Sequence, residues 1–320
     1  MIMIRRLSQV ICLLTIWLSS FPSQCLGQLI TLKELFAIGG ESDTSFFQPL
    51  DIVSLLDGSF VVADAGDFSI KKFDARGNFI SKVGRRGRGP GEFVGGPRRL
   101  CYFKGIIAVS AYDDQRIQFF NDHLEYRSSF IAKKVVGSMD FDPKGNLWIH
   151  FVGSREKSPA VVKYNLDGIE TRTITLNHQS SSHWENEGAL RITSLGDIIF
   201  AYSVMNKVEV WDTSGLIRSE FSISKYPEKV PFRKLPDGSE APENLMFGSI
   251  MVDQSSNIYI KGSHFARNSA RDVDVFDRTG KHLYAFTLPA KIRQMSILGD
   301  RFYTIESNTA TIRVFQWRRD

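Results

Sequence analysis

The densest group of chemically capable side chains is a set of three arginines in the Gly-rich stretch 84–91. A fourth, Arg98, follows at the expected start of a strand, and a later loop insertion adds a histidine and an arginine. A guanidinium binds carboxylate and phosphate groups bidentately, so the set predicts an anionic ligand or an acidic partner surface. The alternative is a Gly-rich turn whose arginines are only solvated. The candidate ligand-binding residues are Arg85, Arg86, Arg88, Arg98, His264 and Arg267.

Histidine and carboxylate side chains offer a second kind of chemistry, metal binding. His178 and His183 share a polar loop, His150 closes an expected strand, and Asp114 aligns in the repeat frame with Asp67 of the neighbouring repeat. Three such ligands in tetrahedral reach could hold zinc, and short acidic side chains could hold calcium. Their spacing does not enforce convergence, because scattered loop histidines and turn-capping aspartates explain the same residues. We therefore expect no cofactor, with one Zn or Ca ion as the alternative.

The charge balance bears on the class of partner. The chain carries 40 basic and 35 acidic side chains, a formal net charge of +5. Without Arg5 and Arg6, which lie in the N-terminal targeting segment, 38 basic and 35 acidic side chains leave +3. This excess is too mild for a nucleic-acid partner, and the arginine stretch lacks the interleaved aromatic residues that single strands need. We expect a protein, peptide or glycan partner, an anionic one where the arginines take part, and no nucleic acid.

The N-terminus reads as a secretory signal peptide over residues 1–27. Two arginines precede the apolar run Leu7–Leu18, and small residues suited to cleavage after Gly27 follow. The run is too short to span a membrane, so the mature chain is expected to be exported to the periplasm or beyond and not to be membrane-spanning. Lipidation of Cys25 is the less favoured alternative, because Gln24 stands where a small residue is usual.

Cysteine usage and motif content limit the catalytic options. Removal of the signal peptide leaves Cys101 as the only cysteine, so no disulfide within the chain is possible. Its apolar neighbours favour a small buried hydrophobe over a nucleophile. The sequence contains no Ser-His-Asp order, phosphate-binding glycine loop, His-Glu-x-x-His or paired-cysteine motif.

A strand pattern that recurs six times must position all of these side chains. Each copy is a short β-type run ending in an aromatic residue, and in four copies a glycine follows the aromatic by four positions. A second strand precedes each copy at a nearly constant offset, and a third, inner strand precedes that pair. The copies begin at Ile70, Ile117, Val161, Val208, Val273 and Ile312.

These repeats predict an all-β fold, a six-bladed β-propeller of four-stranded antiparallel blades. Nothing after the signal peptide has sustained helical periodicity, and residues 28–320 form a single propeller domain with blades of about 49 residues. The last repeat lacks its fourth strand. The N-terminal segment Ile30–Ile38 has the character of that strand and would close the ring, which removes an exposed sheet edge.

One segment resembles a known family. Gly89-Pro90-Gly91-Glu92-Phe93, followed by Pro97 and Arg116–Phe120, resembles the NHL-repeat family and especially its bacterial secreted six-bladed propellers. Val62-Ala63-Asp64 is similar to the family's strand-ending signature. The resemblance implies a propeller used mostly as a binding platform. It also implies a minority of metal-dependent relatives, such as lyases that finish peptide amidation and lactonases.

Loop lengths predict which face of the propeller is functional. In such blades, the loops between second and third strands and the connections between blades open on one face, here called the loop-rich face. The long connections 84–96, 177–189 and 224–247 fall there, as do two insertions. We expect this face to bind a peptide, glycan or protein. The alternative is a metal-dependent lyase or hydrolase with its site at the channel mouth. The proline-rich segment 224–247 could be a lid, a partner-binding edge or a surface decoration.

Overall fold

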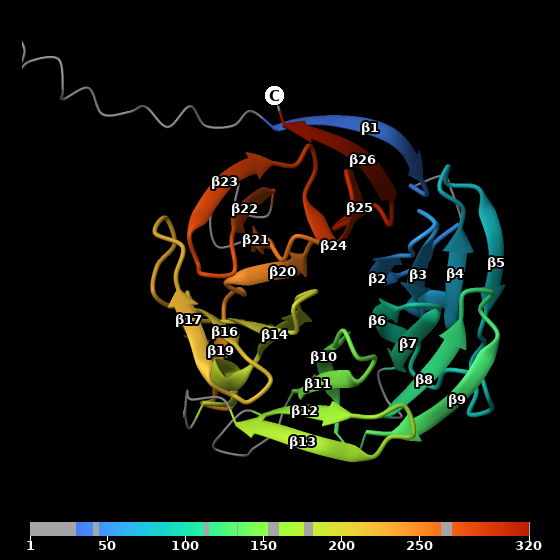
Figure 1. The fold of residues 1–320 in the computed structure, drawn as a ribbon, viewed down its shortest axis with the longest axis horizontal. Helices are drawn as coiled ribbons and strands as arrows, with labels where there is room; N and C mark the ends of the chain where they lie inside the picture. The colour runs from blue at the N-terminus through green and yellow to red at the C-terminus, as the bar shows by residue number, and fades with distance from the viewer. Residues whose placement is uncertain are drawn as a thin grey trace, which may run out of the picture.

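Six four-stranded antiparallel sheets are arranged in a ring in the computed structural model of the chain (Figure 1). Two cavities between the inner strands form its central channel. The structure describes residues 30–40, 45–111, 115–132, 134–152, 160–175, 182–263 and 271–319, without the side chains of His183 and Arg319. The predicted six-bladed, all-β propeller is confirmed. Within the described ranges, no helix is long and apolar enough to cross a membrane.

In the first five blades the strands follow chain order from the channel outward. Blades 1 to 3 are formed by β2 (Pro49–Ser54), β3 (Phe60–Asp64), β4 (Ser69–Phe73) and β5 (Phe79–Val83); by β6 (Pro97–Phe103), β7 (Ile106–Ala111), β8 (Arg116–Asn121) and β9 (Tyr126–Ile131); and by β10 (Val136–Phe141), β11 (Leu147–Phe151), β12 (Ala160–Tyr164) and β13 (Glu170–Thr175).

The remaining blades and the elements outside them complete the chain. Blades 4 to 6 are formed by β14 (Gly188–Ile192), β15 (Ile198–Tyr202), β16 (Val208–Trp211) and β17 (Ile217–Phe221); by β20 (Phe247–Val252), β21 (Ile258–Gly262), β22 (Asp272–Phe276) and β23 (His282–Thr287); and by β24 (Ile292–Leu298), β25 (Arg301–Glu306), β26 (Ile312–Arg319) and β1 (Ile30–Ile38). Outside the blades lie the 3-10 helices η1 (Ala65–Asp67) and η2 (His183–Asn186) and the hairpin β18 (Phe232–Lys234) and β19 (Glu240–Pro242).

The N-terminal strand closes the ring, as the sequence predicts. β1 pairs antiparallel with β26 over its whole length, from Ile30 opposite Arg319 to Ile38 opposite Ile312, and Figure 1 shows the two strands side by side. An ion pair of 2.9 Å between Arg313 and Glu34 joins them. Blade 6 therefore has no unpaired outer edge at β26.

The apolar core is divided into six seams, each between two neighbouring blades. The fully buried Trp148 and Trp211, for example, pack in the seam between blades 3 and 4. Every residue of β3 and of β11 is buried, because both faces of these middle strands meet a neighbouring blade. Strands buried on both faces give continuous apolar runs rather than strict alternation.

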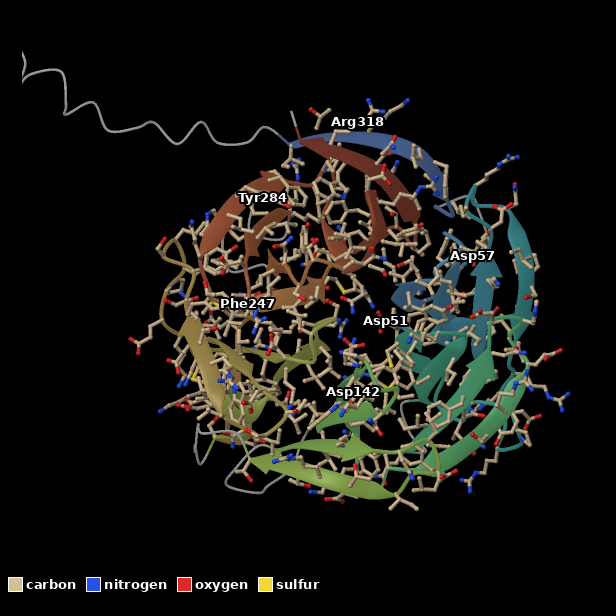
Figure 2. All side chains as sticks on the ribbon, viewed as in Figure 1. Asp51, Asp57, Asp142, Phe247, Tyr284 and Arg318 are labelled. Atoms are coloured by element: carbon tan, nitrogen blue, oxygen red, sulfur yellow. The ribbon has the colours of Figure 1, made fainter. Side chains whose placement is uncertain are left out.

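Side chains of the inner strands supply hydrogen bonds to the channel edge of the next blade. Oδ2 of Asp51 accepts from the backbone N–H of Leu100, and Oδ2 of Asp140 accepts from that of Ile192, both at 2.9 Å (Figure 2 labels Asp51). Without such acceptors, these N–H groups of an inner edge strand would lack a sheet partner. Serine hydroxyls do the same for two further amides, Ser138 for Leu190 and Ser296 for Ser54.

Removing β1 should open the ring. A chain starting at Gly39 loses partly buried apolar side chains from two seams and exposes β26. We expect a loss of more than about 5 kcal/mol, since five apolar side chains leave partly buried positions. Thermal unfolding and size-exclusion chromatography should show a lower Tm or self-association relative to a chain starting at Gln28. An unchanged Tm and a monomeric profile would contradict this role of β1.

Candidate functional site

The arginine loop, defined here as residues 84–96, is held by its own glutamate. Arg85 Nε donates to Oε1 of Glu92 at 2.7 Å, and the Gly89 amide donates to Oε2 at 2.8 Å. The Gly89 amide and the Arg85 guanidinium hold the pKa of Glu92 below its usual value. Phe93 is completely buried beneath the loop. The Gly-Pro-Gly-Glu-Phe motif is thus a self-bonded turn anchored by one aromatic ring.

The other sequence-predicted arginines have different surroundings. The Arg86 guanidinium lies 5.7 Å from the centre of the Phe68 ring, and Arg88 is exposed. Arg98 is half-buried at the start of β6, where Nη1 donates to the Val136 carbonyl of blade 3 at 3.4 Å. The arginine loop is therefore a surface feature, while Arg98 bridges two blades. His264 and Arg267 lie outside the described residues.

The proline-rich segment between blades 4 and 5 forms an ordered structure on the loop-rich face. Its β18–β19 hairpin is tied to η2 by a hydrogen bond from Trp184 Nε1 to the Glu240 carbonyl, 3.1 Å. Lys229 forms an ion pair with Glu185 of η2. Val230 is buried in the seam between blades 4 and 5. The segment is thus fixed against η2 and the seam between blades 4 and 5.

A small polar pocket of about 100 Å³, here called the loop-end pocket, lies at the loop-rich end of the channel. Arg99, rather than Arg98, lines it, and Arg99 Nε donates to the Gly137 carbonyl at 2.8 Å. Ser249 and Gln294 also line the pocket and are almost fully buried. The Ser249 hydroxyl has no hydrogen-bond partner in the described part of the chain. Unpaired buried polar groups carry a desolvation cost, so this hydroxyl suggests a place for a ligand atom.

Lys261 lies directly behind this pocket and is 2% exposed. It stands opposite Ser249 in the β20–β21 pairing, and a methyl group added at Gly248, a lining residue, would collide with its Nζ. Nζ donates to the Gly262 carbonyl at 3.0 Å and forms no ion pair among the described residues. Burial lowers the pKa of Lys261 to about 8. The ammonium is thus a buried positive charge without a counter-ion in the described structure.

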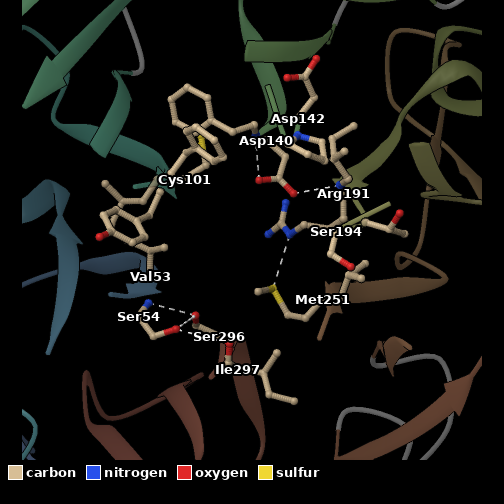
Figure 3. Close-up of a pocket in the computed structure, with 18 of the residues that line it drawn as sticks. Val53, Ser54, Cys101, Asp140, Asp142, Arg191, Ser194, Met251, Ser296 and Ile297 are labelled. Atoms are coloured by element: carbon tan, nitrogen blue, oxygen red, sulfur yellow. Dashed lines mark hydrogen bonds between the residues drawn. The ribbon is translucent and has the colours of Figure 1, made fainter. Parts of the chain in front are cut away.

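A second cavity, here called the turn-end cavity, occupies the opposite end of the channel and measures about 470 Å³ (Figure 3). It opens on the face that carries the short turns between first and second strands. All six blades contribute lining residues. Arg191 lines both this cavity and the loop-end pocket, so it lies between them. Its Nη1 donates to the Leu190 carbonyl at 2.8 Å, and its Nε contacts the sulfur of Met251 at 3.4 Å.

His150 is the one member of the alternative metal set whose side chain the structure describes. It is 1% exposed, its ring meets Phe200 edge-on at 4.8 Å, and Nδ1 is 3.4 Å from the Ala160 carbonyl. Burial lowers the pKa of His150 to about 4. His178 and Asp114 lie outside the described residues, as does the side chain of His183, which begins η2. Within the described ranges, no three His, Cys, Asp or Glu side chains gather to hold a metal.

Cys101 behaves as the sequence predicts. It is 4% exposed in the seam between blades 2 and 3, and desolvation raises the pKa of its thiol well above the usual value. A thiol that resists ionisation is a poor nucleophile. Cys101 lines one wall of the turn-end cavity as a small apolar side chain.

The charged residues that line the channel are not among the site residues that the sequence predicts. Asp51 and Asp140 occur in apolar inner strands, and an acid in such a strand could have indicated the channel wall. Arg191 and Lys261 also sit within short apolar strands. Whether such a charged side chain meets a partner depends on how the neighbouring blades are aligned. The sequence alone does not give that alignment.

Solved structures share the fold over most of the chain at low sequence identity. Virginiamycin B lyase from Staphylococcus aureus is similar with a TM-score of 0.56 and 10% identity, covering 90% of this chain and 99% of its own. A protein from Bacteroides fragilis that is termed exported has a TM-score of 0.60 and 12% identity, covering 91% and 95%. A protein of unknown function from Bacteroides thetaiotaomicron has a TM-score of 0.59 and 11% identity, covering 91% and 76%.

These likenesses show the propeller fold and leave its use open, because fold does not determine function. No protein-family model and no curated protein matches the sequence. The propeller implied by the NHL resemblance is confirmed, and membership of that family stays a prediction.

The buried His150 should make the protein sensitive to acid. The unfolded chain takes up a proton on this ring below pH 6.5, whereas the folded chain does so only near pH 4. Stability from this group is therefore present above pH 6.5 and falls as the pH drops toward 4, by at most about 3 kcal/mol. His150→Phe should remove this loss of stability on acidification, which urea unfolding between pH 4 and 7 measures. Identical pH profiles for the two proteins would show that the ring is not buried in its neutral form.

Proposed function

We propose that the chain is an exported, non-enzymatic binding protein that takes an anionic group of a peptide, glycan or protein at the loop-rich end of its channel. One observation carries the proposal. Lys261 is a buried ammonium with no ion-pair partner among the described residues, and it adjoins a polar pocket lined by Arg99. A buried charge destabilises the protein unless it is paired. An anion that binds here is attracted by the ammonium and also offsets this unfavourable free energy.

The size of the loop-end pocket limits what enters it. A volume of about 100 Å³ accommodates a carboxylate or a phosphate group but not a whole ligand. Ser249 and Gln294 provide hydrogen-bonding groups beside the two cations. The rest of the partner would lie on the loop-rich face, next to the β18–β19 hairpin.

The surface arginines would act at longer range in this proposal. Arg85, Arg86 and Arg88 would attract an anionic partner and raise its association rate, an effect that weakens with salt. Arg98 would mainly hold blade 2 against blade 3. His264 and Arg267 follow β21 directly in the sequence and remain candidates for contact with the partner.

Export rests on the predicted signal peptide, residues 1–27, and places the propeller in the periplasm or outside the cell. The Bacteroides fragilis neighbour that is termed exported is consistent with this. Within the NHL-like propellers that the sequence resembles, the binding platform is the common use. Lipidation at Cys25 stays the less favoured route.

Small anions should test the pocket directly. Acetate, phosphate and sulfate, added at constant ionic strength, should raise Tm, and at ten times Kd the stabilisation is about 1.4 kcal/mol. For a domain of this size that corresponds to a rise of about 2–4 °C. Lys261→Met should abolish the response. The variant removes an unpaired buried charge, so we expect it to be at least as stable as the parent protein. Loss of the response would therefore not reflect unfolding.

A matched pair of surface variants tests the role of the arginine loop. Arg85→Glu with Arg86→Glu should weaken binding of a fluorescent hexaglutamate peptide several-fold at low salt. Lys33→Glu with Arg127→Glu changes the net charge equally on the outer strands β1 and β9 and should have little effect. Equal binding by both double variants would show that the arginine loop does not contribute to binding. An increase in Tm with small anions that persists in Lys261→Met would show that the loop-end pocket is not the anion site.

The alternative function is a metal-dependent lyase or hydrolase. Two of the similar structures are named virginiamycin B lyase and streptogramin B lyase, but at 10–11% identity they support the fold alone. Elemental analysis of the mature chain, Gln28 to Asp320, decides between the two functions. We expect no stoichiometric metal and a Tm that is indifferent to chelator. One zinc or calcium per chain, lost with a fall in Tm, would favour the enzyme and point to His150, His178, His183 and Asp114.

A further inference from the structure

The turn-end cavity has the dimensions of a small-molecule site. Its volume of about 470 Å³ falls within the range of ligand pockets, and it opens on the face away from the proposed partner surface. Apolar side chains from several blades form much of its wall. They include Ile52, Leu100, Phe141, Ile192, Met251 and Ile297.

The acidic groups of this cavity are already engaged by the fold. Asp140 accepts from the amides of Phe141 and Ile192, both at 2.9 Å. Asp142 accepts from Lys163 at 3.1 Å and from Trp148 Nε1 at 3.2 Å. Both carboxylates have their oxygens occupied by donors of the protein itself, so neither is poised to bind a cationic ligand.

The basic groups are not engaged in the same way. The Arg191 guanidinium donates to one backbone carbonyl and contacts one thioether, which is a weak acceptor. Lys104 is exposed at the rim, 5.1 Å from the centre of the Phe103 ring. No carboxylate within the described ranges forms an ion pair with either side chain. The lining carries two cations and two carboxylates, and the charge of Asp140 interacts with that of Arg191. What the cavity offers a ligand is therefore the unused hydrogen-bonding capacity of its cations above an apolar wall.

The backbone at Lys104 gives an independent indication. β6 and β7 are joined by a two-residue turn, and both of its residues, Lys104 and Gly105, have positive φ, 42° and 87°. Turns of this kind favour Asn-Gly, because a lysine in the left-handed region is strained. Residues held in such conformations gather at ligand sites. A cationic side chain thus stands where backbone preference alone would place asparagine or glycine.

We propose that the turn-end cavity binds a small organic anion with an apolar body, its carboxylate or phosphate group on Arg191 and its body against the apolar wall, with Lys104 adding positive charge at the rim. The site is separate from the one that takes the anionic group of a partner at the loop-rich end. Figure 3 shows Arg191 and Met251 on one side of the cavity and Cys101 and Val53 on the other. The ligand would lie between these walls.

Calorimetry with 4-phenylbutyrate, its neutral amide and phenyl phosphate tests the proposal on the mature chain. We expect at least one of the two anions to bind tenfold or more tightly than the amide, and the stronger anion identifies the head group. Arg191→Met should remove this preference while leaving the weak binding of the amide unchanged. Anions that bind no better than the amide would overturn the proposal.

Two further variants separate this site from the loop-end pocket and from effects on folding. Lys104→Gly removes a cation and relieves the positive φ, so Tm should stay the same or rise while anion binding weakens several-fold. Lys261→Met should weaken the binding of these organic anions much less than Lys104→Gly does, even though it abolishes the response to inorganic anions. Organic anions that lose affinity in Lys261→Met but keep it in Lys104→Gly would place them in the loop-end pocket and overturn the assignment made here.

Discussion

The fold depends on burying both faces of every blade, and this is possible only if the ring is closed. The core consists of six separate seams, each shared by two neighbouring blades, with no common centre. A missing blade or an open edge would expose the side chains of two seams at once. The pairing of β1 with β26 prevents this, because it joins the two ends of the chain in one sheet and completes blade 6.

Closure also creates the channel and its polar groups. The six inner strands are edge strands, so some of their backbone amides face the channel and need acceptors. Asp51 and Asp140 provide acceptors across blade boundaries, and they are therefore part of the scaffold although they line pockets. The polar groups left over for binding are those that the scaffold does not use. In the described residues these are chiefly cations, Arg191 and Lys104 at one end and Lys261 at the other.

The distribution of charge explains why net charge says little about this protein's ligands. An excess of about three positive charges over the mature chain is small, but the carboxylates near the channel are paired with amides, lysines or indole groups. Lys163, for example, is used by Asp142. The hydrogen-bonding capacity left at the two ends of the channel therefore belongs mainly to cations, although Asp140 and Asp142 balance Arg191 and Lys104 in formal charge at the turn-end cavity. Low-dielectric walls strengthen each of these charge interactions.

Most of the fold could be predicted from the sequence, because four strands per repeat and the aromatic ending of the third strand recur at regular spacing. Ring closure could also be predicted, since the last repeat is one strand short and Ile30–Ile38 is one strand in excess. The site could not be predicted in the same way. Arg85 looks available in the sequence, yet Glu92, seven residues later, binds it. Lys261 looks like an ordinary polar residue at the end of a strand, yet it is buried without a counter-ion among the described residues.

The two ends of the channel differ in a way that follows from blade geometry. Inner strands begin at the loop-rich face, where bulges in five of the six place extra residues at the channel wall and leave a small polar pocket. They end at short turns, which leave the wider cavity with apolar walls. A group that enters the narrow end must be small and charged, whereas the wide end also has room for an apolar body. Arg191 lies between the two, so an anion bound at one end would reduce the positive potential at the other. If both sites are used, their occupants should therefore bind with mutual weakening rather than independently.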